Sequence, residues 1–404
     1  MRTVPQRVSI QLQTERLNVE DKQRSNLFSW RGQFTPQFVD YLLEAFASPG
    51  QTVLDPFCGS GTVLQEATCH RLVGIGLEIN PAAYAMAKFF SFCSLNVSSR
   101  RLIVERTREI LYSVTSRFVG LPLFHNSSDY RESASNLLDL AREVLDRAED
   151  KQDKLLLLLS LFRAESARNG DLVPTVHRSF QFLSDQLLQL PTTDRAPLAV
   201  LWDARKAHKR LTTGADLIIT SPPYINVFNY HQNYRALLEL VGFDMLRVAQ
   251  SEIGSNRKHR GNRFFTVVQY CMDIEQALAS FARSLVPHGI LIMVLGRESR
   301  VRGVPFGNSA IVKALIETSG AFTRARVHER VFVNRFGQSI FEDILVARRN
   351  GGRAGTGSAR DLARHVLADA LSGASGDVRS NIEEAIALSD SITPSPVFEK
   401  SAVI

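Results

Sequence analysis

The sequence predicts an α/β fold built on a mostly parallel β-sheet, with a helical insertion that interrupts it. Short apolar segments recur along the chain, and several of them lead into helical patterns, which is typical of βαβ units. One pair of these segments is separated by about 120 residues, far more than a single crossover needs. The chain has 404 residues, 44% of them hydrophobic and 22% charged, so it can bury a sizeable core.

The predicted strands are short aliphatic runs of the length that a strand buried on both faces requires. They lie at residues 52–54, 73–77, 198–202, 216–220, 289–295, 330–333 and 344–348. Between the second and third of them, residues 90–197 carry helical periodicity broken by polar or proline-containing stretches, which predicts a small helical subdomain. The run GGRAGTGSA after Arg349 predicts a flexible linker, followed by a tail with amphipathic helices.

The charge of the chain favours a polyanionic partner. Its formal net charge is +7 and its pI is near 9.4, which suits nucleic acid without identifying it. The cysteines form no CxxC pair and accompany no histidine cluster at zinc-ligand spacing, so neither a metal site nor a disulfide framework is expected. They are Cys58, Cys69, Cys93 and Cys271.

The sequence contains no candidate membrane segment. Its N-terminal stretch lacks the apolar core of a signal peptide. The longest apolar run, from Leu155 to Phe162, is too short to span a bilayer. The chain is therefore expected to be soluble and cytoplasmic.

The strongest local signal is the segment VLDPFCGSGTVLQEA at residues 53–67, which reads as an apolar strand, an acidic turn with Gly59 and Gly61, and a helix start. Small residues let a ligand approach the backbone, and the free N–H groups of a helix N-terminus attract a carboxylate or a phosphate. Glu78 ends the next predicted strand, where a carboxylate can accept both ribose hydroxyls of a nucleoside. A tight turn and a surface carboxylate are the structural alternatives.

A second signal is DLIITSPPYINVFNY at residues 216–230, where a predicted strand runs into Ser221, Pro222, Pro223 and Tyr224. Two consecutive prolines hold the backbone extended and leave their carbonyls without reciprocal N–H partners. A rigid turn after the strand is the alternative to a site. Because the carboxyl ends of parallel strands meet at one edge of a sheet, both motifs are expected to line one crevice.

Together these motifs resemble the amino-methyltransferases of DNA, the family that makes N4-methylcytosine or N6-methyladenine. The resemblance covers roughly residues 25–90 and 198–348, where DPFCGSGT is similar to the family's cofactor motif and SPPY to its catalytic tetrapeptide. It implies a sheet of seven strands with the last inserted antiparallel, and S-adenosylmethionine as methyl donor. The cofactor half comes first here, whereas many relatives with SPPY have the reverse order.

The motifs, together with the helical periodicity and composition of the remaining segments, divide the chain into four parts. Residues 1–89 carry the cofactor motifs, residues 90–197 are the insertion, residues 198–349 form the catalytic half, and residues 350–404 are the linker and helical tail. The insertion is a candidate target-recognition subdomain, with a structural or dimerising role as the alternative. The implied cofactor residues lie in the glycine turn, at neighbouring strand ends and in the segment WRGQFTPQFVDYLLEAF at residues 30–46, which is similar to the helix that precedes the cofactor motif: Phe34, Thr35, Asp55, Phe57, Gly59, Gly61, Glu78 and Asp203. Asp203, just past the third predicted strand, matches the acid or amide that meets the cofactor's adenine in that family.

The residue types of the tetrapeptide fit transfer to an exocyclic amino group. Such a nitrogen is a poor nucleophile because its lone pair is delocalised, so the site must polarise it. Ser221 Oγ and the carbonyl of Pro222 can accept the two amino hydrogens. The base must leave the duplex stack, and Tyr224 can then stack on it. The sequence lacks the Pro-Cys dipeptide of the cytosine-C5 enzymes.

A basic segment, EIGSNRKHRGNRFF at residues 252–265, follows the catalytic strand. Basic, amide and aromatic side chains suit phosphate contact and groove entry, and the location favours this function over a plain solvated loop. The predicted nucleic-acid contacts are Arg257, Lys258, Arg260 and Arg263.

The sequence therefore predicts a site-specific methyltransferase of double-stranded DNA, with cytosine N4 favoured over adenine N6 because the tetrapeptide begins with serine. An RNA base methyltransferase with the same chemistry is one alternative. A non-catalytic DNA-binding protein on this scaffold is another. The sequence does not give the recognition site, the oligomeric state or the presence of a cognate restriction endonuclease.

Overall fold

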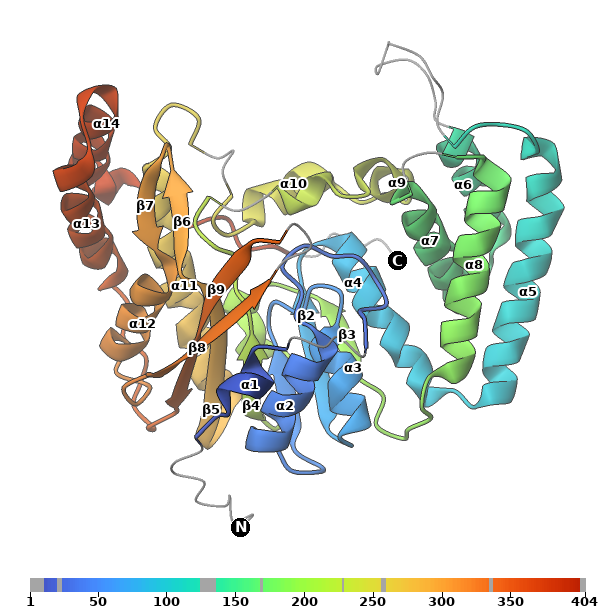
Figure 1. Cartoon of the computed structure of the whole chain (residues 1–404), viewed down its shortest axis with the longest axis horizontal. Helices are drawn as coiled ribbons and strands as arrows, with labels where there is room; N and C mark the ends of the chain where they lie inside the picture. The colour runs from blue at the N-terminus through green and yellow to red at the C-terminus, as the bar shows by residue number, and fades with distance from the viewer. Residues whose placement is uncertain are drawn as a thin grey trace.

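The computed structural model describes residues 11–19, 24–123, 136–167, 170–226, 229–255, 259–333 and 337–399. It contains a central sheet with helices packed on it and a helical subdomain at one side (Figure 1). Within these ranges no helix combines the length and apolarity needed to cross a membrane.

The main sheet is built from strands β1 Thr52–Asp55, β2 Val73–Glu78, β3 Leu198–Leu201, β4 Ala215–Thr220, β5 Leu285–Gly296, β8 Arg326–Val333 and β9 Ser339–Arg348. Its seven strands lie in the order β3-β2-β1-β4-β5-β9-β8. Neighbours from β3 to β5 pair in parallel, and β9 pairs antiparallel with both β5 and β8. This is the Rossmann-like methyltransferase topology with the last strand inserted antiparallel, so the predicted fold class is confirmed.

Both faces of the sheet are covered, which explains the continuous apolar runs of its central strands. In β4, Leu217 and Ile219 pack on one face, while Ile218 between them belongs to the core on the other face. The helices of the first face are α1 Thr14–Leu17, α2 Pro36–Phe46 and α3 Thr62–Cys69, and those of the second are α11 Phe265–Ser284 and α12 Asn308–Thr318.

A helical subdomain occupies the chain between β2 and β3. Its helices are α5 Val97–Thr115, α6 Asn136–Arg147, α7 Lys151–Glu165 and α8 Leu172–Gln189, and they share their core with α4 Pro81–Lys88. α7 lies inside this core, where Leu156, Leu159 and Phe162 are almost completely buried (Figure 1). Burial on nearly all sides explains why the leucine run of α7 shows no polar face.

The remaining elements border the catalytic half of the chain. They are the short helices α9 Arg235–Leu240 and α10 Met245–Ser251, the hairpin strands β6 Glu298–Val301 and β7 Val304–Gly307, and the tail helices α13 Ala359–Ala370 and α14 Gly376–Ala387. The hairpin was not predicted from the sequence. The tail is packed on the sheet domain, because Ala363 and Leu367 of α13 lie in the same core as α11.

The glycine-rich run before α13 is attached to the fold rather than free. The backbone N–H groups of Gly357 and Ala359 donate to the carboxylate of Glu275 in α11, at 2.9 and 3.0 Å. The sequence predicted a flexible linker here. Its anchor is a carboxylate far upstream in the chain, which composition alone does not reveal.

Candidate functional site

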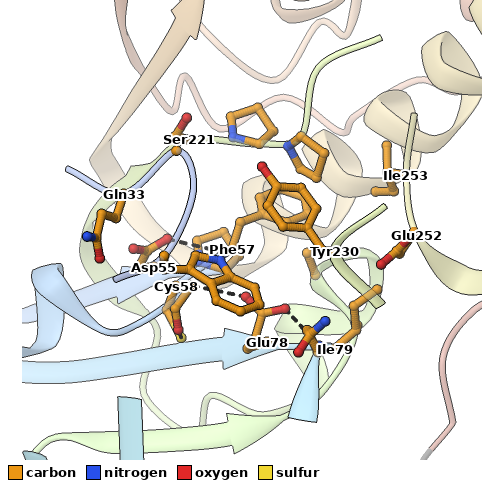
Figure 2. Close-up of a pocket in the computed structure, with 18 of the residues that line it drawn as sticks. Gln33, Asp55, Phe57, Cys58, Glu78, Ile79, Ser221, Tyr230, Glu252 and Ile253 are labelled. Atoms are coloured by element: carbon orange, nitrogen blue, oxygen red, sulfur yellow. Dashed lines mark hydrogen bonds between the residues drawn. The ribbon is translucent and has the colours of Figure 1, made fainter. Parts of the chain in front are cut away.

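The carboxyl ends of β1, β2, β3 and β4 meet at a pocket, where ligands bind in parallel α/β sheets (Figure 2). The pocket wall includes the glycine turn, the chain before α2 and the SPPY tetrapeptide. Predicted residues that line it are Phe34, Asp55, Phe57, Gly59, Glu78, Asp203, Ser221, Pro222, Pro223 and Tyr224. Thr35 and Gly61 lie beside the pocket but outside its lining.

Asp55 ends β1 and connects the two motifs. Its Oδ1 accepts a hydrogen bond from Thr220 Oγ1 at 2.6 Å, and Thr220 is the last residue of β4, directly before the tetrapeptide. The backbone N–H of Phe57 donates to the same oxygen at 3.2 Å. Burial raises the pKa of Asp55 to about 7, against the opposing effect of these hydrogen bonds. The bond fixes the glycine turn relative to the tetrapeptide.

Glu78 ends β2 and faces the glycine turn. Its Oε2 accepts from the backbone N–H of Gly59 at 3.0 Å, and its Oε1 accepts from that of Asn80 at 2.8 Å (Figure 2). Burial raises the pKa of Glu78 to about 7, although the backbone hydrogen bonds lower it. A carboxyl group with a pKa near neutrality exchanges its proton readily when a polar ligand arrives.

The two glycines of the turn serve different purposes. Gly59 lines the pocket with φ +50°, and a Cβ there would lie 3.3 Å from the Trp30 ring. Gly61 has φ +91° and is the N-cap residue of α3, where a Cβ would lie 2.8 Å from the Cα of Ala87. Gly61 therefore permits close packing of α3 on α4, while Gly59 leaves space toward the pocket.

The chain before α2 covers the glycine turn. Ser60 Oγ donates to Gln33 Oε1 at 2.6 Å, and Phe34 is buried in the pocket wall. Thr35 occupies the N-cap position of α2 without capping it by its side chain, and its hydroxyl oxygen is buried with no hydrogen-bond partner among the described residues. A buried hydroxyl of this kind is a candidate for contact with a polar ligand.

The SPPY tetrapeptide follows β4 as extended chain. The ring of Tyr224 packs over Gly296 at the end of β5, where a Cβ would lie 3.0 Å from the ring. Gly254 has φ +70° and touches the same residue, since a Cβ there would lie 2.2 Å from the carbonyl oxygen of Tyr224. Burial raises the pKa of the Tyr224 hydroxyl, so the side chain stays neutral.

Asp203 contributes to the pocket wall, but its carboxylate is engaged inside the protein. Oδ1 accepts from the backbone N–H and from Nε of Arg205, both at 2.9 Å. Oδ2 accepts from Arg205 Nη2 at 2.7 Å and from the backbone N–H of Phe398 at 2.8 Å. Each oxygen thus uses both of its lone pairs. The residue predicted to meet the adenine carries four protein donors instead.

Several lining residues were not predicted from the sequence. The rings of Trp30 and Tyr230 stack with centroids 5.7 Å apart beside the glycine turn. Glu252 lies in the same wall and accepts from the backbone N–H and Nδ1 of His231, both at 2.7 Å. Trp30 and Glu252 each lie at the start of a segment that was predicted to be functional because of other residues. Their position in these segments was the only sign in the sequence that they belong to the site.

The predicted nucleic-acid contacts are divided in the structure. Arg257 and Lys258 lie outside the described residues, and Arg260 is exposed. Arg263 is half-buried and donates from Nη2 to Asn226 Oδ1 at 2.5 Å, close to the tetrapeptide. Asn262 from the same segment is buried against α14, where its amide donates to Glu384. Only part of the basic segment therefore faces solvent.

Among the described residues, no group of His, Cys, Asp or Glu side chains could hold a metal ion. Burial raises the pKa of the Cys58 thiol in the glycine turn, so this cysteine is a poor nucleophile.

Sequence comparisons with known proteins match the N-terminal part of the chain. Residues 9–89 match the family model N6_N4_Mtase, described as DNA methylase. The type II methyltransferase M.MjaII of Methanocaldococcus jannaschii is 27% identical over 88 residues, which are 22% of this chain and 15% of that protein. The matched segment therefore spans a small part of that relative.

Solved structures of methyltransferases show only a distant likeness. TrmN from Thermus thermophilus has 15% identity and a TM-score of 0.34, covering 79% of this chain and 50% of the other. The rRNA methyltransferase aviRa from Streptomyces viridochromogenes has 13% identity and a TM-score of 0.32, covering 84% and 94%. Neither likeness bears on the substrate of this chain.

The matched region, residues 9–89, holds the glycine turn and Glu78. The strand order of the sheet and the tetrapeptide in the same pocket agree with this match. Through this region the chain is similar to the DNA methylase family of N6 and N4 amino-methyltransferases, and the match supports S-adenosylmethionine as the cofactor.

Proposed function

We propose that this chain transfers a methyl group from S-adenosylmethionine to the exocyclic amino group of a base extruded from double-stranded DNA. One observation carries the proposal: the glycine turn with Glu78 and the tetrapeptide that begins at Ser221 line one pocket. The hydrogen bond from Thr220 to Asp55 holds these two parts together. A cofactor on the turn and a base at the tetrapeptide would therefore meet at adjacent strand ends.

The pocket fits a nucleoside that carries an amino-acid tail. Glu78 lies where a carboxylate can accept from ribose hydroxyls, and its two backbone donors leave acceptor capacity on the group. Thr35, next to the lining residue Phe34, offers a buried hydroxyl with no partner among the described residues. When bound, S-adenosylmethionine supplies an electrophilic methyl group on its sulfonium centre.

The tetrapeptide supplies the polarisation that the amino group needs. Ser221 and Pro222 follow the end of β4 in the pocket wall. In this proposal Ser221 Oγ and the carbonyl of Pro222 accept the two amino hydrogens. Accepting both hydrogens draws the nitrogen toward a tetrahedral shape and makes its lone pair available for in-line attack. Tyr224 stays neutral and presents a ring for stacking on the extruded base. No strong general base is required before the transfer.

The surface around the tetrapeptide suits contact with a DNA backbone. Asn226 donates to the carbonyl of Arg300 in the β6–β7 hairpin at 2.6 Å and accepts from Arg263 at 2.5 Å. Arg260 of the basic segment and Arg300 and Arg302 of the hairpin region are exposed. Arginines here can neutralise the phosphates that flank an extruded base. The hairpin therefore joins the basic segment as a proposed DNA contact.

We further propose that cytosine N4 is the target atom, because the tetrapeptide begins with serine.

The helical subdomain within residues 90–197 is proposed to take part in target recognition. Its support is a connection to the chain just after the tetrapeptide: α9 packs on α6, and the hydroxyl groups of Tyr234 and Ser166 lie 2.8 Å apart. A partner restriction endonuclease is proposed only by analogy with type II enzymes.

The test is a transfer assay with S-adenosylmethionine labelled in its methyl group, run separately on genomic double-stranded DNA and on total RNA. Mass spectrometry of the digested product is expected to show N4-methylcytosine from DNA. N6-methyladenine from DNA would overturn the cytosine preference alone, and label confined to RNA would overturn the DNA assignment. The Ser221→Ala protein, purified in parallel, controls for a contaminating methyltransferase.

A further inference from the structure

A buried ion-pair network lies beside the cofactor pocket, around Arg205. This residue is in the 3-10 helix Ala204–Lys209 that directly follows β3. Its side chain is 1% exposed and pairs with Asp203 at 2.7 Å and with Asp273 of α11 at 3.0 Å, which are 3% and 0% exposed. These three buried charges have lost their contacts with water, so each depends on the others for hydrogen bonds and for charge compensation.

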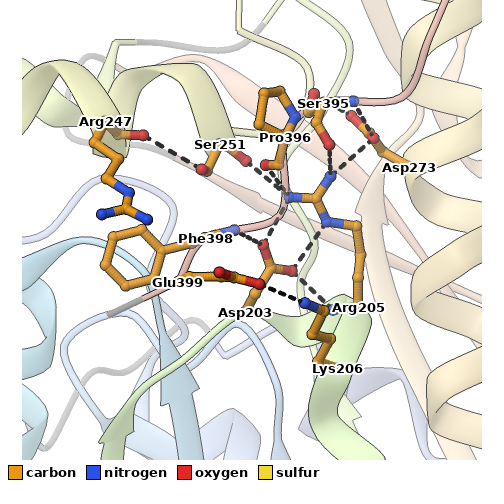
Figure 3. Close-up of polar contacts among 10 residues, drawn as sticks. All are labelled: Asp203, Arg205, Lys206, Arg247, Ser251, Asp273, Ser395, Pro396, Phe398 and Glu399. Atoms are coloured by element: carbon orange, nitrogen blue, oxygen red, sulfur yellow. Dashed lines mark hydrogen bonds and ion pairs between the residues drawn. The ribbon is translucent and has the colours of Figure 1, made fainter. Parts of the chain in front are cut away.

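The last described residues of the chain complete this network. We call residues 395–399 the C-terminal strap. Arg205 Nη1 donates to the carbonyl of Ser395 at 2.6 Å, and Arg205 Nη2 donates to that of Pro396 at 2.8 Å (Figure 3). In return, the backbone N–H of Ser395 donates to Asp273 at 2.8 Å and that of Phe398 donates to Asp203 at 2.8 Å. The strap is bound through backbone groups and both acids.

The same arginine also contacts the part of the pocket wall that lies at the end of α10. Arg205 Nη2 also donates to the carbonyl of Ser251 at 3.4 Å, where α10 ends (Figure 3). Ser251 lines the pocket, as do Asp203 and Ala204 from the β3 side. Arg205 therefore joins two walls of the pocket to the strap. The wall on the β3 side lies next to Glu78, because Glu78 at the end of β2 pairs with Leu201 of β3.

We propose that Arg205 is a positioning residue that couples docking of the C-terminal strap to binding of the adenosine part of the cofactor. When the strap is docked, its carbonyl groups complete the hydrogen bonds of Arg205, and the two parts of the pocket wall at residues 203–204 and 251–253 are held together. With the strap displaced, Arg205 and both acids lose partners and the two walls are released. This inference rests on the proposed cofactor site, and it gives Asp203 a role in holding the wall.

Thermodynamic linkage makes the proposal testable in the unaltered protein, because a strap that favours cofactor binding must itself be favoured by the cofactor. Hydrogen exchange at the backbone amides of Ser395 and Phe398 is measured with and without S-adenosylhomocysteine, and with adenosine alone. We expect slower exchange with both ligands. Faster exchange would mean that the ligand displaces the strap, and unchanged exchange would mean no coupling; either result overturns the proposal.

Variants of the full chain supply the second measurement. Arg205→Lys keeps the charge but loses the forked donors, and Ser395→Ala removes the hydroxyl that donates to Asp273 at 2.5 Å. Both are expected to weaken S-adenosylhomocysteine binding in calorimetry, Arg205→Lys by about 5- to 150-fold, the range of typical couplings. The KM for S-adenosylmethionine should rise while kcat at saturating cofactor stays at the parental value.

Lys206→Ala is the matched control. Lys206 is the next residue, and its side chain pairs with Glu399 of the strap at 3.0 Å. This ion pair is exposed to solvent and so contributes little, and the Lys206 side chain bonds neither carboxylate of the network. It is expected to bind S-adenosylhomocysteine as the parent does. If the parent protein binds no S-adenosylhomocysteine, the cofactor assignment fails; if the parent and Arg205→Lys bind equally, the coupling alone is refuted.

Discussion

The cofactor site can be tested at Glu78 in two ways, by changing the ionisation of its carboxyl group and by removing its side chain. In the ligand-free protein burial raises the pKa of Glu78 to about 7, so the carboxyl is largely protonated at lower pH. Ribose hydroxyls donate best to the ionised form, so binding should release a proton. Affinity for S-adenosylhomocysteine is therefore expected to rise as pH increases toward about 7 and to level off above it.

The magnitude follows from the hydrogen bonds that the carboxylate would accept. Two charge-assisted bonds at about 1.5–3 kcal/mol each give about 3–6 kcal/mol. Glu78→Ala should thus weaken binding at about pH 8 by at least about a hundred-fold. Calorimetry in buffers of different ionisation enthalpy measures both the affinity and the proton release. In Glu78→Gln, the part of the pH dependence of binding that comes from titration of Glu78 should disappear. Any pH dependence that remains can come from Asp55, whose pKa is also about 7.

Glu66→Gln is the matched control for this experiment. Burial likewise raises the pKa of Glu66 to about 7, but the residue lies in α3 outside the pocket lining. Its replacement should leave both the affinity and the proton release unchanged. Parental affinity in Glu78→Ala, or a flat pH profile in the parent, would refute the assignment of Glu78 to the ribose.

Other variants test the chemistry and the DNA surface. Ser221→Ala is expected to slow single-turnover transfer by about a hundred- to a thousand-fold with cofactor binding intact, and a parental rate would refute polarisation by this hydroxyl. Tyr224→Phe should be nearly neutral, whereas Tyr224→Ala should lose about 1–3 kcal/mol of stacking; equal loss would reveal a role for the hydroxyl. Alanine at both Arg260 and Arg300 should flatten the log–log salt dependence of DNA binding by about 0.9 per lost phosphate contact, and an unaltered slope would exclude both residues. Exchanging residues 90–197 with the insert of a relative should change the methylated sequence, unless recognition lies elsewhere.

The sequence by itself determined the fold class and the two halves of the pocket. A strand that is buried on both faces of the sheet needs a continuous apolar run, as at residues 217–219, so such strands can be predicted from the sequence. Gly59, Glu78 and Ser221 could be brought to one edge because the carboxyl ends of parallel strands meet there. Local chemistry and strand polarity were sufficient for these residues.

The partners of buried polar groups were decided only by the tertiary structure. Asp203 has the residue type and position of an adenine acceptor, yet Arg205 and the backbone of Phe398 occupy both of its oxygens. Glu252 enters the pocket wall as the partner of His231, and no local pattern marks that pair. A buried charge must find a partner wherever the fold places one. The strap lies far from Asp203 in the sequence and meets it only through the folded sheet and α11, so sequence spacing does not predict the contact.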